Sequence, residues 1–453
     1  MKYIKWLLPI LLLVLASFSS LSMAVKVIVH PDEQAAMDQL IKKLNIPIDK
    51  IEIFPYEIKE KIYRDSYLIK NRFQYHAESQ GGISIDTNKR NRVANLTISW
   101  TNLSDLQEIS QFKDLVFLQL NSNNLKHLKG VSNLKELKEL SVIGNDSLVD
   151  IGDLRDLPNL KEFNGAVLKN VSEARGLNNL PKLETFICNR CKLNDLTPIG
   201  KLKNLKTLEI GTIVKSISPL ESLKKLEELD VTANNLIDAS AVNGMTSIKS
   251  IIIHDSLLEE IKLSKSLVNL EYLRIVDSKL KEIPDFSPYK NMDRISIVRS
   301  DITSIEGLHG LHKLTELSLI ENKKLTSVSS LRDFPMLKEL KIERTPIITL
   351  GMGVYPNLEK LDISGTDITK LENFSNYPKL SQLFLNKTKV TSLEGAEDAP
   401  YLWHVQTDYS LRVGENGEIL SRLAKRFNKP YMERQIKRKE ESDRKKKERE
   451  SKD

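Results

Sequence analysis

The sequence predicts an α/β solenoid, because one short apolar pattern recurs along most of the chain at a nearly constant spacing. The segments 115–125 (LVFLQLNSNNL) and 226–236 (LEELDVTANNL) share the form L-x-x-L-x-L-x-x-(N/S/T)-x-L. The second apolar position of this pattern recurs every 22 residues, with an occasional step of 21 or 23. The fifteen residues at this position are Leu96, Leu118, Leu140, Phe163, Phe186, Leu208, Leu229, Ile251, Leu273, Ile295, Leu317, Leu340, Leu361, Leu383 and Val405.

Repeats of this length and pattern define a leucine-rich-repeat array. Between the strands the apolar residues recur at every third position, as in Leu125, Leu128 and Val131. This spacing suits 3₁₀ turns better than α-helices or strands. Because no turn can bury its leucines alone, the turns are expected to stack. The predicted fold is a right-handed curved array of about 15 turns with a parallel, concave β-sheet.

A small polar residue follows most of the predicted strands, where the chain must bend. Its side chain is expected to point inward and to satisfy backbone groups that the bend leaves unpaired. The residues at this position are Asn123, Asn145, Asn234, Asn322, Ser256, Ser278, Ser300, Thr345, Thr366 and Thr388.

The only two cysteines lie in a CNRC segment at the spacing that thiol oxidoreductases use. Because Phe186 takes a strand position, Cys188 takes the next inward position and Cys191 the polar position at the bend. Both are therefore predicted to be buried, and free thiols are the favoured state. A structural disulfide is the alternative, and a redox centre is least favoured because it needs an exposed thiolate.

Segments within the repeats resemble the internalin-like class of secreted bacterial leucine-rich-repeat proteins. The segments 196–210 (LTPIGKLKNLKTLEI) and 217–231 (ISPLESLKKLEELDV) are similar to that class nearly position for position. The resemblance covers roughly residues 94–405. It implies protein recognition without naming a partner.

The first 24 residues have the pattern of a secretory signal peptide. Two lysines near the start precede an apolar run at Trp6–Leu15, and small residues stand at Ser22 and Ala24. The mature chain is expected to begin at Val25, to be secreted or periplasmic, and to have no transmembrane segment. An uncleaved membrane anchor is the alternative.

The remaining segments are predicted to be caps and a tail. Residues 25–80 read as a small helical N-terminal cap with a strand and two helices, and 81–410 as the solenoid, entered through a strand pair at 81–96. Residues 411–430 are the predicted C-terminal cap, and 431–453 form a basic, charged tail. From Lys425 to Asp453 there are 13 Lys or Arg and 7 Asp or Glu, which gives +6 of the formal net charge of +7.

The tail has two interpretations. Its positive charge would allow weak contact with an anionic surface. The favoured interpretation is a solvated end, because acidic and basic residues are interleaved and aromatic residues are nearly absent.

The sequence predicts no catalytic residue, no cofactor and no metal site. It has no G-x-S-x-G or H-E-x-x-H motif and no glycine loop that could cradle a phosphate. His309 and His312 flank leucines on the back of one turn, without an apparent third metal ligand.

Two functions are compatible with these observations. The first is an exported binding module that recognises a protein or peptide ligand on its concave face. The second is a non-catalytic envelope scaffold that docks to anionic surfaces through its basic tail.

The recognition surface is expected where strand residues point out of the concave sheet, since strand side chains alternate between the two faces. Between Ile251 and Leu317 these positions are rich in apolar residues, with one tyrosine and several arginines. An exposed apolar patch with a charged rim is typical of a binding interface. The alternative is that these residues only favour β-strand structure and have no role in binding. The predicted binding residues are Ile252, His254, Tyr272, Arg274, Val276, Arg294, Val298, Arg299 and Ile320.

Overall fold

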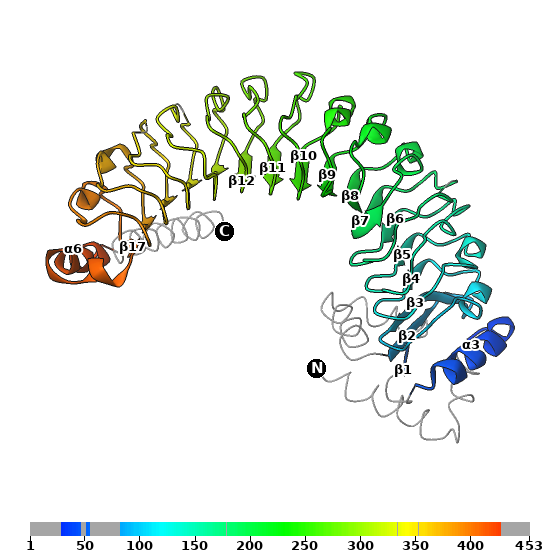
Figure 1. Cartoon of the computed structure of the whole chain (residues 1–453). Helices are drawn as coiled ribbons and strands as arrows, with labels where there is room; N and C mark the ends of the chain where they lie inside the picture. Colours follow the sequence, from blue (N-terminus) through cyan, green and yellow to red (C-terminus); the bar gives the residue numbers. More distant parts are fainter. Residues whose placement is uncertain are drawn as a thin grey trace, which may run out of the picture. The chain divides into compact units, whose positions relative to one another are not determined.

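A computed structural model describes residues 29–46, 51–54, 82–177, 179–332, 334–351 and 353–426. The chain divides into two compact units, Met1–Ala233 and Asn234–Asp453. Within each unit, successive turns contribute one strand each to a parallel sheet (Figure 1). All fifteen predicted positions lie in strands, so the predicted solenoid is confirmed.

The described residues of unit 1 begin with one helix and three strands. Helix α3 (Pro31–Leu44) is followed by β1 (Ile51–Phe54), which pairs in parallel with β2 (Gly82–Thr87). Strand β2 pairs antiparallel with β3 (Val93–Ser99). The first cap helix and the entry strand pair were predicted, whereas β1 was not. The signal peptide, the second cap helix and the basic tail lie outside the described residues.

Strand β3 begins the regular parallel stack. In unit 1 it continues with β4 (Phe117–Gln119), β5 (Glu139–Ser141), β6 (Glu162–Asn164), β7 (Thr185–Leu193), β8 (Thr207–Thr212) and β9 (Glu228–Thr232). Unit 2 holds β10 (Ser250–His254), β11 (Tyr272–Val276), β12 (Arg294–Val298), β13 (Glu316–Ser318), β14 (Glu339–Lys341), β15 (Lys360–Asp362), β16 (Gln382–Phe384) and β17 (His404–Gln406).

The backs of the turns contain the predicted 3₁₀ segments. In unit 1 these are η2 (Ile109–Gln111), η3 (Val131–Asn133), η4 (Ile199–Lys201) and η5 (Ser218–Leu220). In unit 2 they are η6 (Ser240–Gly244), η7 (Phe374–Asn376), η8 (Ala396–Asp398) and η9 (Tyr409–Arg412). Helix α6 (Gly414–Ala424) follows η9 and buries Ile419 and Leu423.

The polar residues at the bends behave as predicted in most turns. Asn145 is fully buried and donates from Nδ2 to the carbonyl oxygens of Leu120 and Val142, each at 2.8 Å. Its Oδ1 accepts from the backbone N–H of Leu125 at 3.1 Å. In unit 2, Asn322 donates the two equivalent bonds, to the carbonyl oxygens of Ile297 and Leu319, and its Oδ1 accepts from the backbone N–H of Ser300. The asparagine therefore replaces backbone partners that the bend removes.

The prediction for Asn234 is wrong, because this side chain is exposed. Strand β9 keeps the alternation of an extended chain through Leu229 and Val231 up to the buried Ala233. The inward position is thus reached one residue earlier than in the other turns.

The expectation of free thiols is also wrong, because Cys188 and Cys191 form a disulfide. Their predicted burial is confirmed. The chain bends between them, so that their Cα atoms lie 5.4 Å apart, within the range that a disulfide can bridge. The bend that brings Asn145 close to Val142 in another turn therefore brings two thiols together here.

Candidate recognition surface

The strand register of unit 2 places most of the predicted binding residues in neighbouring rows. On β11 and β12, Tyr272 is paired with Arg294, and Val276 with Val298. On β10, Ile252 is the register partner of Arg274. The alternation of buried and partly exposed residues along β10 and the first part of β11 places Ile252, Tyr272 and Arg274 on the outer face of the sheet.

Three of these residues form a compact group, which we call the arginine patch: Tyr272, Arg274 and Arg294. The guanidinium carbon of Arg294 lies 4.6 Å from the centre of the Tyr272 ring, a cation–π geometry. The Nη1 group of half-buried Arg274 donates to the hydroxyl of Ser296 at 3.1 Å. Within the described part of the chain, Arg274 has no carboxylate partner.

The predicted open apolar patch is wrong for two of its members. Val276 is only 4% exposed and Val298 only 6% exposed. Parallel strands lie about 4.8 Å apart, so equivalent side chains in neighbouring turns cover one another. Ile252, His254 and Ile320 remain half-buried beside these valines.

Arg299 differs from Arg274 in having an ion pair with a carboxylate, which it contacts at two points. Its Nε and Nη2 groups donate to the two carboxylate oxygens of Asp277 at 2.5 and 2.6 Å. This hydrogen bonding lowers the pKa of Asp277 and raises the pKa of Arg299. The guanidinium of Arg299 is therefore already largely satisfied within the protein.

A group of charged residues on β13 to β15 was not predicted as part of the surface. Glu316 and Glu339 are register partners, and Oε1 of Glu339 lies 2.9 Å from Nζ of Lys341 and 2.7 Å from Nζ of Lys360. Burial acts to raise the pKa of Glu339, but the two ammonium groups outweigh it and lower the pKa to about 2. Burial and the contact with Glu339 raise the pKa of Glu316.

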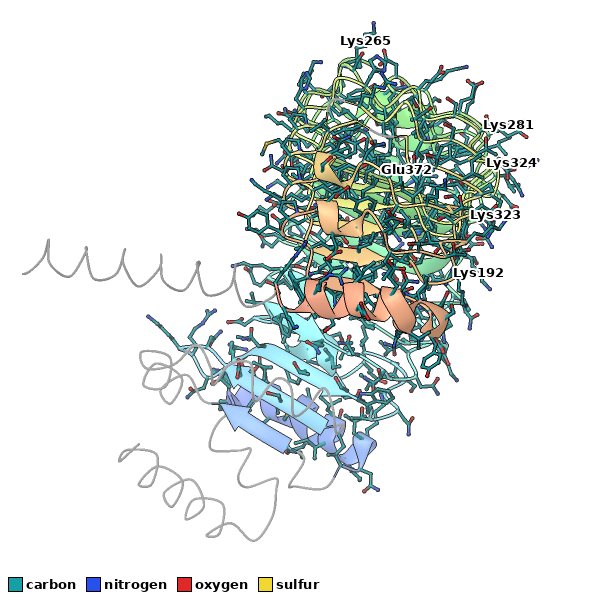
Figure 2. The ribbon with its side chains drawn as sticks, turned by 90° about the vertical axis from the view of Figure 1, so that its left-hand side faces the viewer. Lys192, Lys265, Lys281, Lys323, Lys324 and Glu372 are labelled. Carbon is teal, nitrogen blue, oxygen red and sulfur yellow. A yellow bond between two sulfur atoms is a disulfide. The ribbon has the colours of Figure 1, made fainter. Side chains whose placement is uncertain are left out.

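Charged side chains also project from the edges of the unit 2 turns, as Figure 2 shows for Lys281 and Lys324. Lys281 pairs with Glu259 at 2.5 Å, and Lys324 pairs with Asp301 at 3.2 Å. Because these pairs are exposed, each contributes little to stability.

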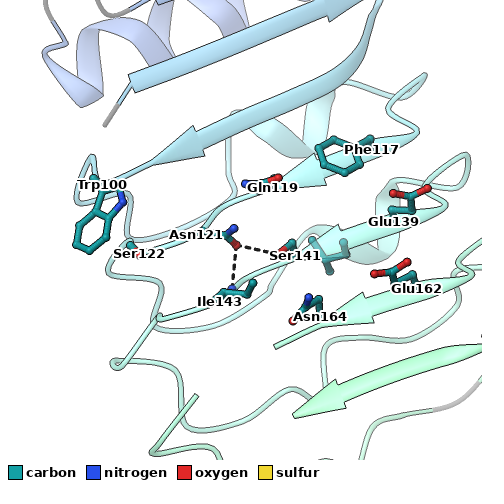
Figure 3. Close-up of a pocket in the computed structure, with 11 residues that line it drawn as sticks. Trp100, Phe117, Gln119, Asn121, Ser122, Glu139, Ser141, Ile143, Glu162 and Asn164 are labelled. Atoms are coloured by element: carbon teal, nitrogen blue, oxygen red, sulfur yellow. Dashed lines mark hydrogen bonds between the residues drawn. The ribbon is translucent and has the colours of Figure 1, made fainter. Parts of the chain in front are cut away.

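Unit 1 contains a separate pocket of about 400 Å³ on the outer face of β4 to β6 (Figure 3). Phe117, Glu139 and Glu162 line one end of it, and Trp100 lies at the other end. Asn121 lies between these ends, where its Oδ1 accepts from the hydroxyl of Ser141 and from a backbone N–H group. The pocket therefore combines aromatic, amide and carboxylate groups.

The paired outward positions of β4 to β9 include acidic residues but no lysine or arginine. The acidic residues are Glu139, Glu162, Glu209, Glu228 and Asp230. Burial, followed by the neighbouring carboxylate of Glu139, raises the pKa of Glu162. These acidic residues could have been predicted from the sequence. The strand alternation that placed Tyr272 and Arg274 on the outer face places the acidic residues there as well. The sequence prediction took the residues beside its apolar column only from the turns between Ile251 and Leu317.

His309, one of the two histidines considered as metal ligands, makes other contacts. Nδ1 of His309 lies 3.0 Å from the carbonyl oxygen of Glu306, and Nε2 lies 3.4 Å from a carboxylate oxygen of Asp285. Among the residues that the structure describes, no cluster of three or more metal-binding side chains is present. In the same residues, no helix is long and apolar enough to cross a bilayer.

The fold and the strand registers are those of a leucine-rich-repeat solenoid. The family model of the endo-β-N-acetylglucosaminidase EndoS leucine-rich-repeat domain matches residues 286–388. Leucine-rich repeat-containing G-protein coupled receptor 5 of Rattus norvegicus is 30% identical over 173 residues, which cover 36% of this chain and 19% of that receptor. The match thus spans about a fifth of that relative's length.

Two solved structures have a similar fold at low sequence identity. Internalin InlF from Listeria monocytogenes is 20% identical, with a TM-score of 0.55, and the match covers 69% of this chain and 86% of that chain. The structure of PEPR1–AtPEP1 is 18% identical, with a TM-score of 0.55, and the match covers 72% and 50% of the two chains.

Proposed function

We propose that this protein is a non-catalytic recognition module that binds a protein or peptide ligand on the outer face of its strands. The observation that carries this proposal is the arginine patch. Arg274 is half-buried beside a tyrosine–arginine stack, and its only partner in the described residues is the Ser296 hydroxyl. A guanidinium has five N–H donors, so most of this donor capacity is available to a ligand.

Residue type and fold support the same proposal. Tyrosine and arginine are enriched among the residues that carry most of the binding energy at protein interfaces. PEPR1, which has the same fold, was solved together with AtPEP1. Parallel strands in a solenoid form an extended surface suited to a polypeptide ligand.

The test is a binding titration with Tyr272→Ala and Arg274→Ala. A ligand captured from envelope and host extracts would be purified and titrated by calorimetry. Each substitution should weaken binding by about 2 kcal/mol, because each removes a side chain typical of interface hot spots. Circular dichroism should show an intact fold, since neither side chain is in the core.

Two controls sharpen this titration. Lys313→Ala removes an exposed cation from the back of a turn and should leave binding unchanged. Arg299→Ala should have a smaller effect than Arg274→Ala, because Asp277 already binds the Arg299 guanidinium. Equal losses for Arg274→Ala and Lys313→Ala would contradict the proposed surface.

We also propose that the protein is exported. The signal-peptide pattern of residues 1–24 supports export. The disulfide between Cys188 and Cys191 supports it as well, because disulfides persist mainly in oxidising compartments. N-terminal sequencing of protein recovered outside the cytoplasm should begin at Val25, and a retained Met1 would contradict cleavage.

A further inference from the structure

The pocket in unit 1 contains an uncompensated pair of acidic residues. Glu139 on β5 and Glu162 on β6 are register partners, so their side chains stand directly opposite each other on neighbouring strands. Like charges in this arrangement destabilise a sheet. Neither carboxylate has an ion pair with lysine or arginine in the described ranges. The free protein thus carries an electrostatic cost at this point.

Unit 2 contains the same arrangement with its charge balanced. Glu316 and Glu339 occupy the equivalent positions on β13 and β14, and Lys341 and Lys360 supply two ammonium groups to Glu339. In this second pair one glutamate, Glu339, holds two lysine ammonium groups through its Oε1, at 2.9 Å from Lys341 and 2.7 Å from Lys360.

The two lysine positions of unit 2 have neutral equivalents in unit 1. The register places Asn164 of β6 where β14 has Lys341, and Thr185 of β7 where β15 has Lys360. The glutamate pair is therefore repeated in unit 1 without either cation. A ligand can supply the missing charge.

We propose that this pocket binds a lysine or arginine side chain of a polypeptide ligand, with the cationic group between the carboxylates of Glu139 and Glu162. This inference rests on the proposed function and names the chemistry of the ligand at one site. The other acidic side chains on the outer face of unit 1 favour a basic polypeptide segment over an acidic or neutral one.

The remaining walls of the pocket fit the rest of such a ligand. Phe117 lies in the same row as the two glutamates, where its ring can contact the cation or its aliphatic stem. Trp100 is 64% exposed at the opposite end, an unusual position for so large an apolar side chain. Asn121 Nδ2 has no partner among the described residues and can donate to a ligand carbonyl group.

The experiment uses the full chain and a labelled nonapeptide of three Lys-Tyr-Ser repeats. Fluorescence anisotropy measures its affinity beside two matched peptides in which norleucine or glutamate replaces every lysine. Four variants are compared: Glu162→Gln, Thr185→Lys, Glu316→Gln and Glu221→Gln. Glu316→Gln removes one glutamate of the charge-balanced pair Glu316–Glu339 in unit 2. Glu221→Gln removes an exposed glutamate from the back of a turn in unit 1.

The lysine peptide should bind more tightly than the norleucine and glutamate peptides. Glu162→Gln should weaken its binding about tenfold, because a charge-assisted contact is lost. Thr185→Lys should weaken it at least as much, since the new ammonium can occupy the pocket from within the chain. The same substitution should raise the melting temperature of the free protein, which distinguishes it from misfolding. Glu316→Gln and Glu221→Gln should bind like the unmodified chain.

Equal affinity for the lysine and norleucine peptides would overturn the inference, as would unchanged binding to both Glu162→Gln and Thr185→Lys. Equal weakening by Glu221→Gln would also overturn it, because the attraction would then be a general effect of net charge. None of these results bears on the arginine patch. The proposed function would fail separately, if Tyr272→Ala and Arg274→Ala left binding of the captured ligand unchanged.

Discussion

Replacing Asn145 with alanine should lower the free energy of unfolding by about 4 kcal/mol, one of the largest effects of any single substitution outside the apolar core. The substitution leaves the carbonyl oxygens of Leu120 and Val142 and the N–H group of Leu125 without their side-chain partner in a buried bend. Each buried polar group that loses its partner costs about 1 to 3 kcal/mol. Urea denaturation followed by circular dichroism measures the difference.

Two further variants test the reason for this loss. Asn145→Asp keeps the shape but removes both donors of Nδ2, so it should destabilise the fold nearly as much as alanine. Asn234→Ala changes the asparagine that occupies the same place in the sequence pattern but is exposed. It should change stability by less than about 0.5 kcal/mol. Similar losses for Asn145→Ala and Asn234→Ala would contradict the inward role of Asn145.

The strands could be predicted from the sequence because one period of 22 residues fixes them all. Each strand leucine is buried only if its turn aligns with the next, so a single repeated spacing determines fifteen strands together. The bend after each strand is less well determined. At the same pattern position, Asn145 is buried and Asn234 is exposed, because β9 continues its alternation to Ala233.

The backbone at the bends also differs from what the residue types indicate. Val167, Arg299, Glu321 and Arg344 all have positive φ angles, between 50° and 63°. In two other turns glycine occupies the equivalent position, at Gly144 and Gly365. Glycine at this position indicates a left-handed backbone, but valine, arginine or glutamate does not. In those turns the left-handed conformation is imposed by packing against the neighbouring turns, which the local sequence does not show.

The candidate site was only partly predictable for a similar reason. Alternation along the strands correctly placed Tyr272 and Arg274 on the outer face. It could not show that Val298 is covered by its neighbours, or that Arg299 is bound by Asp277, because both depend on contacts between turns. The same holds for Glu139 and Glu162 in the unit 1 pocket. Only the strand register shows that these two glutamates lie opposite each other.

The second large effect concerns Phe163 and Gly165, which lie in one strand turn of unit 1. Phe163 takes the strand position that Leu140 holds in the preceding turn, and Gly165 takes the place of Val142. A Cβ atom at Gly165 would lie 3.0 Å from the Phe163 ring and 2.6 Å from Cδ1 of Leu168. The ring therefore fills the space that a side chain at residue 165 would need.

A double-mutant cycle tests this exchange of volume. Gly165→Val alone should cost about 3 kcal/mol, because it overpacks a core with few voids. Phe163→Leu alone should cost about 1 to 2 kcal/mol, because it leaves a cavity. The double variant restores the leucine–valine pair of the preceding turn, and the Leu168 side chain can move into the vacated space. It should be more stable than Gly165→Val alone, with a coupling energy of about 1 to 3 kcal/mol.

The control for this cycle is Phe186→Leu combined with Gly165→Val. The Phe186 ring contacts Phe163, with ring centres 5.2 Å apart, but it is not among the nearest neighbours of a Cβ atom at Gly165. This combination should show the full cost of both substitutions, because the shortened residue does not make room for the valine. If the costs of Phe163→Leu and Gly165→Val are simply additive in urea denaturation, the ring and the glycine do not share one volume. A favourable coupling seen only with Phe163→Leu would establish that the large ring at 163 requires the glycine at 165.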